Sequence, residues 1–363
     1  MYNKATAQRP TKGRRITTVS LASLLACVVS IGCRHDHLPS LSTGGHDYTQ
    51  VNLVADTAGY NAVRIDTSLH NPWGISLGST GIFWISVNHS GSTAIYDSLG
   101  NQKLADVDIP FNGIKNGSAP TGSVYNSTSG FLINGVKAKF IYASEDGLIS
   151  GWVGGDTTTI TAADRSASNT VYKGIAIAND GTGNFIYATD FHNGKVDVYD
   201  QQFNLVSNKP FSDPNIPTGF APFNIRNIGG KLYVTYAKQL GPDNHDDQTG
   251  AGNGYVDIYN PDGSFVKRFA TQGALNSPWG VIQAPAGFGQ GTGAILVGNF
   301  GDGTINVFDS SGDYKGQLDN AGVPLYIDGL WDLAFSISNT SQLYFTAGPA
   351  AESHGLFGYI RLK

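Results

Sequence analysis

Cysteine is nearly absent from this chain of 363 residues. The two cysteines, Cys27 and Cys33, both precede Arg34, so the rest of the chain can form no disulfide. A domain without disulfides must be held together by its own apolar core, which a chain of this length can supply. Stabilisation by disulfide bonds is therefore excluded for everything beyond Cys33.

Charged residues are also scarce, at 14% of the chain, where about a quarter is usual. The chain has one methionine and little of the lysine, glutamate and leucine patterning that is typical of helices. It has instead 47 glycines, 17 tyrosines and 18 phenylalanines, with glycine-rich turns between aromatic and β-branched runs. This composition predicts an all-β protein.

Basic residues are few beyond the N-terminus. Five of the 23 lie in residues 1–32, which have no acidic residue, so 18 basic residues remain against 28 acidic ones. The resulting net charge of −10 repels phosphate backbones. Nucleic-acid binding is therefore not expected.

The N-terminal segment has the pattern of a secretory signal. Its five basic residues precede an uncharged apolar stretch, residues 16–32, that is short and rich in serine and threonine for a membrane span. The sequence Ser30-Ile31-Gly32-Cys33 resembles the lipobox of bacterial lipoproteins, which implies cleavage and lipidation of Cys33. An ordinary signal peptide and an uncleaved anchor are the alternatives. We expect a lipoprotein-type signal over residues 1–32 and a tether over residues 33–47.

One pentapeptide recurs along the chain and sets its organisation. Asn71–Ile75, with the sequence Asn-Pro-Trp-Gly-Ile, returns as Ser277–Val281, and a weaker copy occupies Gly329–Leu333. The tryptophans lie 206 and then 52 residues apart, and 206 is close to four times 52. A unit of that length therefore repeats. We expect Trp73 and Trp279 to pack between neighbouring units.

Each unit has the pattern of four short strands. A first strand led by glycine or proline precedes a second strand rich in isoleucine, tyrosine and valine, a polar loop, and an alternating third strand that ends in Tyr/Phe-Asp. A short fourth strand often follows. Alternation such as Val196 and Val198 against Lys195 and Asp197 is typical of a half-buried strand. The first strands of six units begin at Pro72, Thr121, Gly174, Pro222, Pro278 and Leu330.

Four strands in about 50 residues are typical of a propeller blade. The sixth unit has room for only three strands, and the apolar segment Tyr48–Val54 is available to supply the fourth. Closing the ring in this way removes an exposed sheet edge. The sequence thus predicts one all-β domain over residues 48–363, a six-bladed β-propeller closed by its N-terminal strand.

These strand patterns resemble NHL-repeat six-bladed propellers over residues 48–363. The Asn-Pro-Trp-Gly opening and the run from His245 to Asp257 resemble, more narrowly, a family of secreted bacterial propellers with no assigned activity. The resemblance implies the fold and little about function, because propellers host binding, hydrolysis and lyase chemistry alike.

In a propeller, the loops that join second to third strands open on one face around the central channel. Turn chemistry explains acidic residues such as Glu145, Asp146 and Asp302 in these loops, but it does not call for histidine. Asn224 and Asp190 also resemble the Ca²⁺-binding residues of lactonase and phosphotriesterase-type propellers. The candidate ligand-binding residues are His89, Asp190, His192, Asn224, Asn299, Glu352 and His354.

The longest loop, Gln239–Gln248, contains the best candidates for metal ligands, His245, Asp246 and Asp247. Carboxylates favour Ca²⁺, and a histidine beside them favours a transition metal. The alternative is a solvated loop that caps the channel.

Two functions remain open at this stage. The first is an exported, lipid-anchored binding module for a protein or glycan at the cell envelope, held at the outer or cytoplasmic membrane and facing the periplasm or exterior. The second is a metal-dependent hydrolase of lactonase or esterase type, with its site at the channel mouth. No catalytic residue is assigned, the ligand and any divalent metal such as Ca²⁺ are unidentified, and a monomer is expected.

Overall fold

The computed structural model describes residues 42–290 and 293–363, and nearly all their regular structure is β-strand. The expected signal, Cys33 and most of the tether lie outside the described residues. Within those residues, no helix is long and apolar enough to cross a membrane. The all-β prediction is confirmed.

Four sheets each contain four antiparallel strands. Three run in chain order, and the fourth skips the small hairpin of β8 (Leu132–Ile133) and β9 (Val136–Lys137). The first sheet has β3 (Pro72–Leu77), β4 (Phe83–Val87), β5 (Ser92–Tyr96) and β6 (Val107–Asp108). The second has β7 (Pro120–Tyr125), β10 (Phe140–Ser144), β11 (Leu148–Trp152) and β12 (Ile160–Asp164). The third has β13 (Tyr172–Asn179), β14 (Asn184–Asp190), β15 (Lys195–Tyr199) and β16 (Leu205–Val206). The fourth has β17 (Phe220–Ile228), β18 (Lys231–Lys238), β19 (Gly254–Tyr259) and β20 (Phe265–Thr271).

The remaining strands form one ten-stranded sheet in which the N-terminal strand is central. β1 (Ser42–Ala55) pairs antiparallel with the C-terminal strand β28 and parallel with β24. It begins at Ser42 instead of Tyr48, the predicted start of the domain, because its first residues pair with β24. The other members are β2 (Arg64–Ile65), β21 (Pro278–Gln283), β22 (Ile295–Asn299), β23 (Ile305–Phe308), β24 (Tyr314–Asn320), β25 (Val323–Pro324), β26 (Leu330–Phe335), β27 (Gln342–Ala347) and β28 (Leu356–Leu362).

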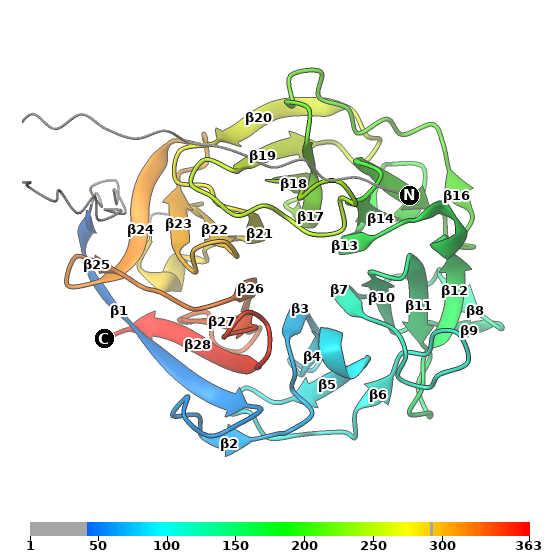
Figure 1. Cartoon of the computed structure of the whole chain (residues 1–363), viewed down its shortest axis with the longest axis horizontal. Helices are drawn as coiled ribbons and strands as arrows, with labels where there is room; N and C mark the ends of the chain where they lie inside the picture. The colour runs from blue at the N-terminus through cyan, green and yellow to red at the C-terminus, as the bar shows by residue number, and fades with distance from the viewer. Residues whose placement is uncertain (1–41, 291–292) are drawn as a thin grey trace, which may run out of the picture. The chain divides into compact units, whose positions relative to one another are not determined.

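The first strands contact one another in a continuous circuit. β3 contacts β7, and the contacts pass on through β13, β17, β21 and β26 back to β3. Figure 1 shows these strands nearest the middle of the described part, with the other strands of each sheet farther out. Three short 3₁₀ turns, η1 (Asn88–Ser90), η2 (Ser166–Ser168) and η3 (Ala286–Phe288), lie in connections.

Each first strand carries a bulge near its start. The register with the second strand shifts just after Pro72, Pro120, Tyr172, Pro222, Pro278 and Leu330. A bulge bends the strand and turns a side chain in a new direction. The residues at this bulge position are Trp73, Thr121, Lys173, Phe223, Trp279 and Trp331.

The glycine of the repeated motif follows the bulge because neighbouring first strands come very close there. A Cβ atom on Gly74 would lie 2.6 Å from the Thr121 carbonyl oxygen, and one on Gly280 would lie 2.8 Å from that of Trp331. Two of the six strands have a polar residue at this position instead of glycine. Its side chain bridges the gap: Asn224 Nδ2 donates to Trp279 O at 2.8 Å, and Asp332 Oδ2 accepts from Ile75 N at 2.8 Å.

Three tryptophans pack on one another, and the contacts of Trp73 and Trp279 with Trp331 join neighbouring first strands, as the sequence predicts. The ring of Trp73 stacks on that of Trp331 with centroids 3.5 Å apart, and Trp279 meets both edge-on. The bulges explain this packing, since they turn the side chains toward a common centre. We call Trp73, Trp279 and Trp331 the tryptophan layer; all three are at most 2% exposed.

Candidate functional site

Lys173 occupies the bulge position at which three other first strands carry tryptophan. Its side chain is 2% exposed, and its ammonium group bonds Glu145 Oε1 and lies 3.5 Å from Asp246 Oδ1. The ammonium also lies over the Trp73 ring, 5.2 Å from its centroid. A lysine this deeply buried is uncommon and requires such partners.

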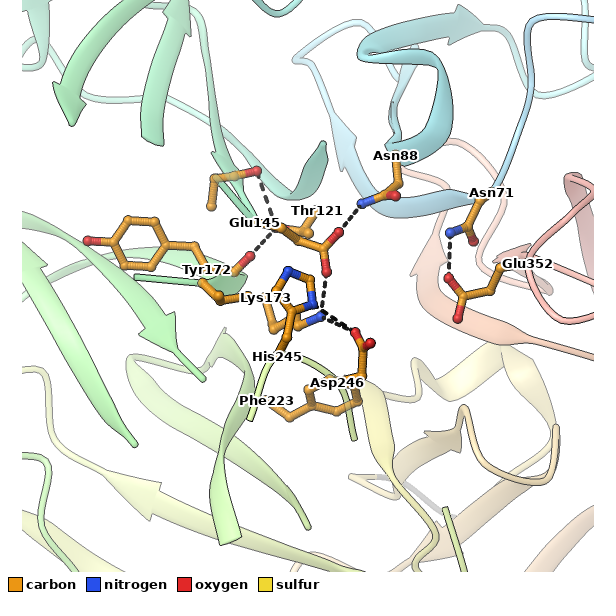
Figure 2. Close-up of polar contacts among 12 residues, drawn as sticks. Asn71, Asn88, Thr121, Glu145, Tyr172, Lys173, Phe223, His245, Asp246 and Glu352 are labelled. Atoms are coloured by element: carbon orange, nitrogen blue, oxygen red, sulfur yellow. Dashed lines mark hydrogen bonds and ion pairs between the residues drawn. The ribbon is translucent and has the colours of Figure 1, made fainter. Parts of the chain in front are cut away.

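Glu145 lies in the turn between β10 and β11 and receives two donors. Besides Lys173, Asn88 Nδ2 donates to Glu145 Oε2 at 2.9 Å (Figure 2). Burial opposes ionisation of Glu145, but the Lys173 ammonium and these hydrogen bonds outweigh it, so the pKa of Glu145 is lowered. Burial likewise opposes the charge on Lys173, and Glu145 outweighs it and raises the pKa of Lys173. Both groups are therefore charged near neutral pH.

His245 and Asp246 reach the same place from the long loop between β18 and β19 (Figure 2). His245 Nδ1 lies 2.9 Å from Asp246 Oδ1. This hydrogen bond raises the pKa of His245 above 6.5, and it is the main reason that the pKa of Asp246 falls to about 2. Both side chains are partly exposed, at 43% and 67%.

Glu352 lies in the turn between β27 and β28. Its pKa is raised, whereas the pKa values of Glu145 and Asp246 are lowered. Burial raises its pKa to about 7, although Asn71 Nδ2 donates to Glu352 Oε2 at 2.7 Å and lowers it in part. The charge of Glu145 also raises the pKa of Glu352, and the charge of Lys173 lowers it. Asn71 Oδ1 in turn accepts a hydrogen bond from Trp331 Nε1 at 2.9 Å.

We call Asn71, Glu145, Lys173, His245, Asp246 and Glu352 the mouth cluster. Two polar atoms of the tryptophan layer, Trp73 Nε1 and Trp279 Nε1, are buried without a hydrogen-bond partner among the residues that the structure describes. Buried polar atoms in native proteins nearly always have a partner. These two indole N–H groups are therefore donors without an acceptor among the described residues.

Three of the residues predicted from the sequence belong to this cluster: His245, Asp246 and Glu352. His89 lies beside it, 3.4 Å from Asn71 Nδ2. Asp247 follows Asp246 in the loop, and burial raises its pKa, but it is not part of the group whose donor atoms converge.

The other predicted residues have different partners. Asp190 is fully buried and accepts hydrogen bonds from the backbone of Val171 and Asn193 and from nearby side chains. Asn299 Nδ2 donates to Ala274 O at 2.8 Å. Together with Asn224, which bonds Trp279 O, these residues tie loops and strands to one another. His192 Nδ1 lies 2.8 Å from Asp243 O, and His354 Nδ1 lies 2.9 Å from Asp56 Oδ2.

Sequence reasoning missed Lys173 and Asn71, and it attributed Glu145 to turn chemistry. A signal for Lys173 exists in the repeat, because one lysine stands where other units carry tryptophan or phenylalanine. Asn71 is the first residue of the repeated pentapeptide, so the sequence marks its position. Its contact with Glu352, 281 residues away, is not readable from the sequence.

The donor atoms of Glu145, His245 and Asp246 lie within 4.8 Å of one another, as a metal site requires. The Lys173 ammonium lies among them, bonded to Glu145 and 3.5 Å from Asp246. A divalent cation placed there would be repelled by this fixed positive charge. The residues therefore fit a metal poorly, because the Lys173 ammonium already pairs with both carboxylates.

Two uncharacterised proteins of Acanthamoeba polyphaga mimivirus are similar to this chain. They are 36% and 37% identical to it over 325 residues, which span 86% of this chain and 80% and 85% of theirs. No known family profile matches the sequence.

Several solved structures share the fold at low sequence identity. Virginiamycin B lyase from Staphylococcus aureus is 11% identical with a TM-score of 0.52, over 88% of this chain and 100% of its own. A gluconolactonase from Xanthomonas campestris is 15% identical with a TM-score of 0.50, over 81% and 86%. An α-L-arabinofuranosidase from Fusarium graminearum is 12% identical with a TM-score of 0.55, over 88% and 98%. This likeness supports a propeller-like fold. It does not show that the chain is an NHL-repeat propeller or belongs to a secreted bacterial family.

Proposed function

Because this chain belongs to the same family as the two mimivirus proteins, which are themselves uncharacterised, we propose its function from its own mouth cluster. The protein is a hydrolase or lyase that transfers protons on a small polar substrate. One observation carries this proposal: Glu145 and Asp246, from two separate segments, hold the buried ammonium of Lys173, and His245 bonds Asp246 beside it, while the charges of Lys173 and Glu145 act on the pKa of Glu352.

Glu352 and His245 are the groups suited to exchange protons. The pKa of Glu352 is about 7, so it titrates close to neutral pH, and the hydrogen bond with Asp246 raises the pKa of His245. General acids and bases work best when their pKa is near the working pH. Both side chains are partly exposed, so a substrate in the mouth can reach them.

Lys173 supplies positive charge beneath these groups. Glu145 and Asp246 keep it protonated, and its burial strengthens its effect on a negative charge that develops nearby. Hydrolysis of a lactone or ester, and elimination next to a carbonyl, both place negative charge on an oxygen in the transition state. The cluster therefore supports those reaction classes. The solved lyase, lactonase and arabinofuranosidase share only the fold and leave the choice among them open.

The proposal is tested with a panel of chromogenic lactones, esters, glycosides and uronide substrates. Glu352→Gln and His245→Gln should each lower kcat by at least about 100-fold, because each removes a proton-transferring group. The wild type should show a bell-shaped pH profile. Asp313→Asn makes the same kind of change at a carboxylate with a 75% exposed side chain and should leave the rate unchanged.

Two outcomes would overturn the enzyme proposal. One is the absence of turnover of every panel member by folded wild-type protein. The other is turnover that survives in both the Glu352 and His245 variants, which would place the chemistry elsewhere.

A metal-dependent hydrolase, predicted from the sequence, is the second candidate, supported by the convergence of Glu145, His245 and Asp246. Metal analysis before and after chelation separates the two. Since the Lys173 ammonium already pairs with Glu145 and Asp246, we expect no stoichiometric metal and an unchanged melting temperature in EDTA. A metal bound at one per chain would favour the second candidate.

We also propose the finer features of the fold and location that the sequence predicts. Six first strands in circuit and the pairing of β1 with β28 support a six-bladed propeller closed by the N-terminal strand. We propose export and a lipid anchor on Cys33, which the apolar stretch of residues 16–32 supports. Such an anchor would suit a binding role for a protein or glycan at the cell envelope.

A further inference from the structure

A cavity lies at the other end of the first strands, away from the mouth cluster. Its volume is about 210 Å³, and residues of β3, β7, β13, β17, β21 and β26 line it. Lys173 and Trp73 lie near the beginnings of these strands, whereas the lining residues Leu77 and Tyr125 are the last of theirs. Trp279 lines the cavity and packs edge-on against Trp73, so the tryptophan layer stands between the cavity and Lys173.

Arg226 is the one cation among the residues that line this cavity. Its Nη2 bonds Asp332 Oδ1 and lies 3.3 Å from Leu333 O. Its Nε and Nη1 have no acceptor among residues 42–290 and 293–363, and the side chain is 25% exposed. These N–H groups are therefore open to a molecule in the cavity.

Asp332, the one acid of the lining, has little accepting capacity left. Besides the bond from Arg226, its carboxylate accepts from Ile75 N at 2.8 Å and from Leu333 N at 2.7 Å. It is 2% exposed. The cavity thus offers hydrogen-bond donors and little free carboxylate to a ligand. The remaining wall mixes aliphatic side chains with polar ones. The aliphatic ones are Ile75, Leu77, Val124, Ile175, Ile177 and Ile225, and the polar ones are Ser76, Ser123, Tyr125, Asn224 and Asn227.

We propose that this cavity is a second binding site, which takes a small organic carboxylate. A guanidinium group forms its strongest hydrogen bonds with carboxylates, and the aliphatic residues of the wall can contact the carbon atoms of such a molecule. An apolar cavity of about 150 Å³ accommodates benzene, so this one holds a molecule of the size of benzoate or a short fatty acid. The site is independent of the chemistry at the mouth cluster.

The test measures benzoate binding by ligand-observed NMR and by tryptophan fluorescence, since Trp279 lines the cavity. Arg226→Lys retains a cation for the ion pair with Asp332 but removes the free guanidinium donors. It should weaken binding about tenfold.

A second variant fills the cavity without disturbing the charges. Ser123 lines the cavity, and the equivalent positions in neighbouring first strands carry Ile75 and Ile175. Ser123→Ile places the same side chain in β7, so the fold should accept it and benzoate binding should be lost. Melting temperatures of both variants confirm that they are folded.

Benzamide and Glu352→Gln serve as controls. Benzamide has the same shape without the charge and should bind at least about tenfold more weakly than benzoate. Glu352→Gln should bind benzoate like the wild type. The proposal is wrong if wild-type protein shows no saturable benzoate binding up to about 10 mM. It is equally wrong if benzamide binds as tightly, if Ser123→Ile binds normally, or if Glu352→Gln abolishes binding.

Discussion

Single side chains decide what the mouth cluster is. Lys173 occupies a position that other units give to an aromatic residue, and its charge holds two carboxylates from different segments. Without it, the same carboxylates and His245 would resemble a metal site. One substitution in a repeat therefore changes the chemistry that the surrounding loops can support.

Replacing Lys173 tests how strongly the cluster depends on this charge. Lys173→Met leaves Glu145 buried without its cation, so the free energy of unfolding should fall by about 3 to 5 kcal/mol. Urea unfolding at pH 7 measures this loss.

The matched control for that variant removes both charges. Lys173→Met combined with Glu145→Gln should recover most of the lost stability, because no uncompensated charge remains buried. A single variant as stable as the wild type would mean that water, rather than Lys173, satisfies Glu145.

Glu352 should make stability depend on pH. Its folded-state pKa of about 7 lies above the ordinary value of 4.5, so the folded protein binds the proton more tightly than the unfolded chain. Its contribution to stability is then fully present below pH 4.5 and is lost as pH rises through 7.

Glu352→Gln removes this titration. Relative to the wild type, the free energy of unfolding of the variant should rise by about 3 kcal/mol between pH 4.5 and pH 8. Urea unfolding of both proteins across this range gives the difference. A constant difference at all pH values would show that Glu352 titrates normally.

At the scale of elements, the bulges of the first strands organise both the core and the site. Each bulge turns one side chain toward the centre, and the next position permits the close approach of neighbouring strands. Threonines of second strands satisfy the backbone there: Thr189 Oγ1 accepts from Gly174 N at 2.7 Å and Thr235 Oγ1 from Asn224 N at 2.9 Å. The repeated motif thus has a structural role in the packing of neighbouring first strands.

Gly280→Ala tests this account of the motif. The added Cβ would lie 2.8 Å from the Trp331 carbonyl oxygen, so strands β21 and β26 must separate and stability should fall by about 1 to 3 kcal/mol. Gly183→Ala is the control, because its Cβ would meet no atom closer than 3.7 Å. Thermal unfolding compares the two. Equal melting temperatures would mean that close approach is not why glycine occupies this position.

At the scale of the whole molecule, β1 joins the two ends of the described chain. It pairs with β28, so the first and last strands share one sheet. If residues 1–32 are a lipoprotein signal, as the sequence predicts, the lipid on Cys33 would lie nine residues before the start of β1 at Ser42.

Cys33→Ser tests the predicted anchor in cells that process lipoproteins. The variant should move from the membrane fraction to the soluble fraction, because one acyl-bearing residue is the predicted attachment. Cys27→Ser is the matched control, because it changes the other cysteine of the segment and leaves Cys33 in place. This variant should stay in the membrane fraction. Retention of the Cys33 variant in the membrane would show that the anchor is different.

The sequence by itself determined the all-β class, the strand order within each unit and the position of most loops, because strand alternation and turn residues are local properties. The third strand β15 (Lys195–Tyr199), for example, contains the predicted alternation of Val196 and Val198 with Lys195 and Asp197. The sequence also identified His245, Asp246 and Glu352 as candidate residues. Local pattern was sufficient for these.

Only the tertiary structure decided which of these residues meet and with what charge. Asn71 and Glu352 are 281 positions apart, and the pKa of Glu352 depends on burial that no local pattern reveals. The Asn-Pro-Trp-Gly stretch was recognisable as a repeat, but its tryptophans meet at the centre because bulges in separate strands turn them there. Long-range packing sets the contacts and the dielectric surroundings, and those in turn set the chemistry.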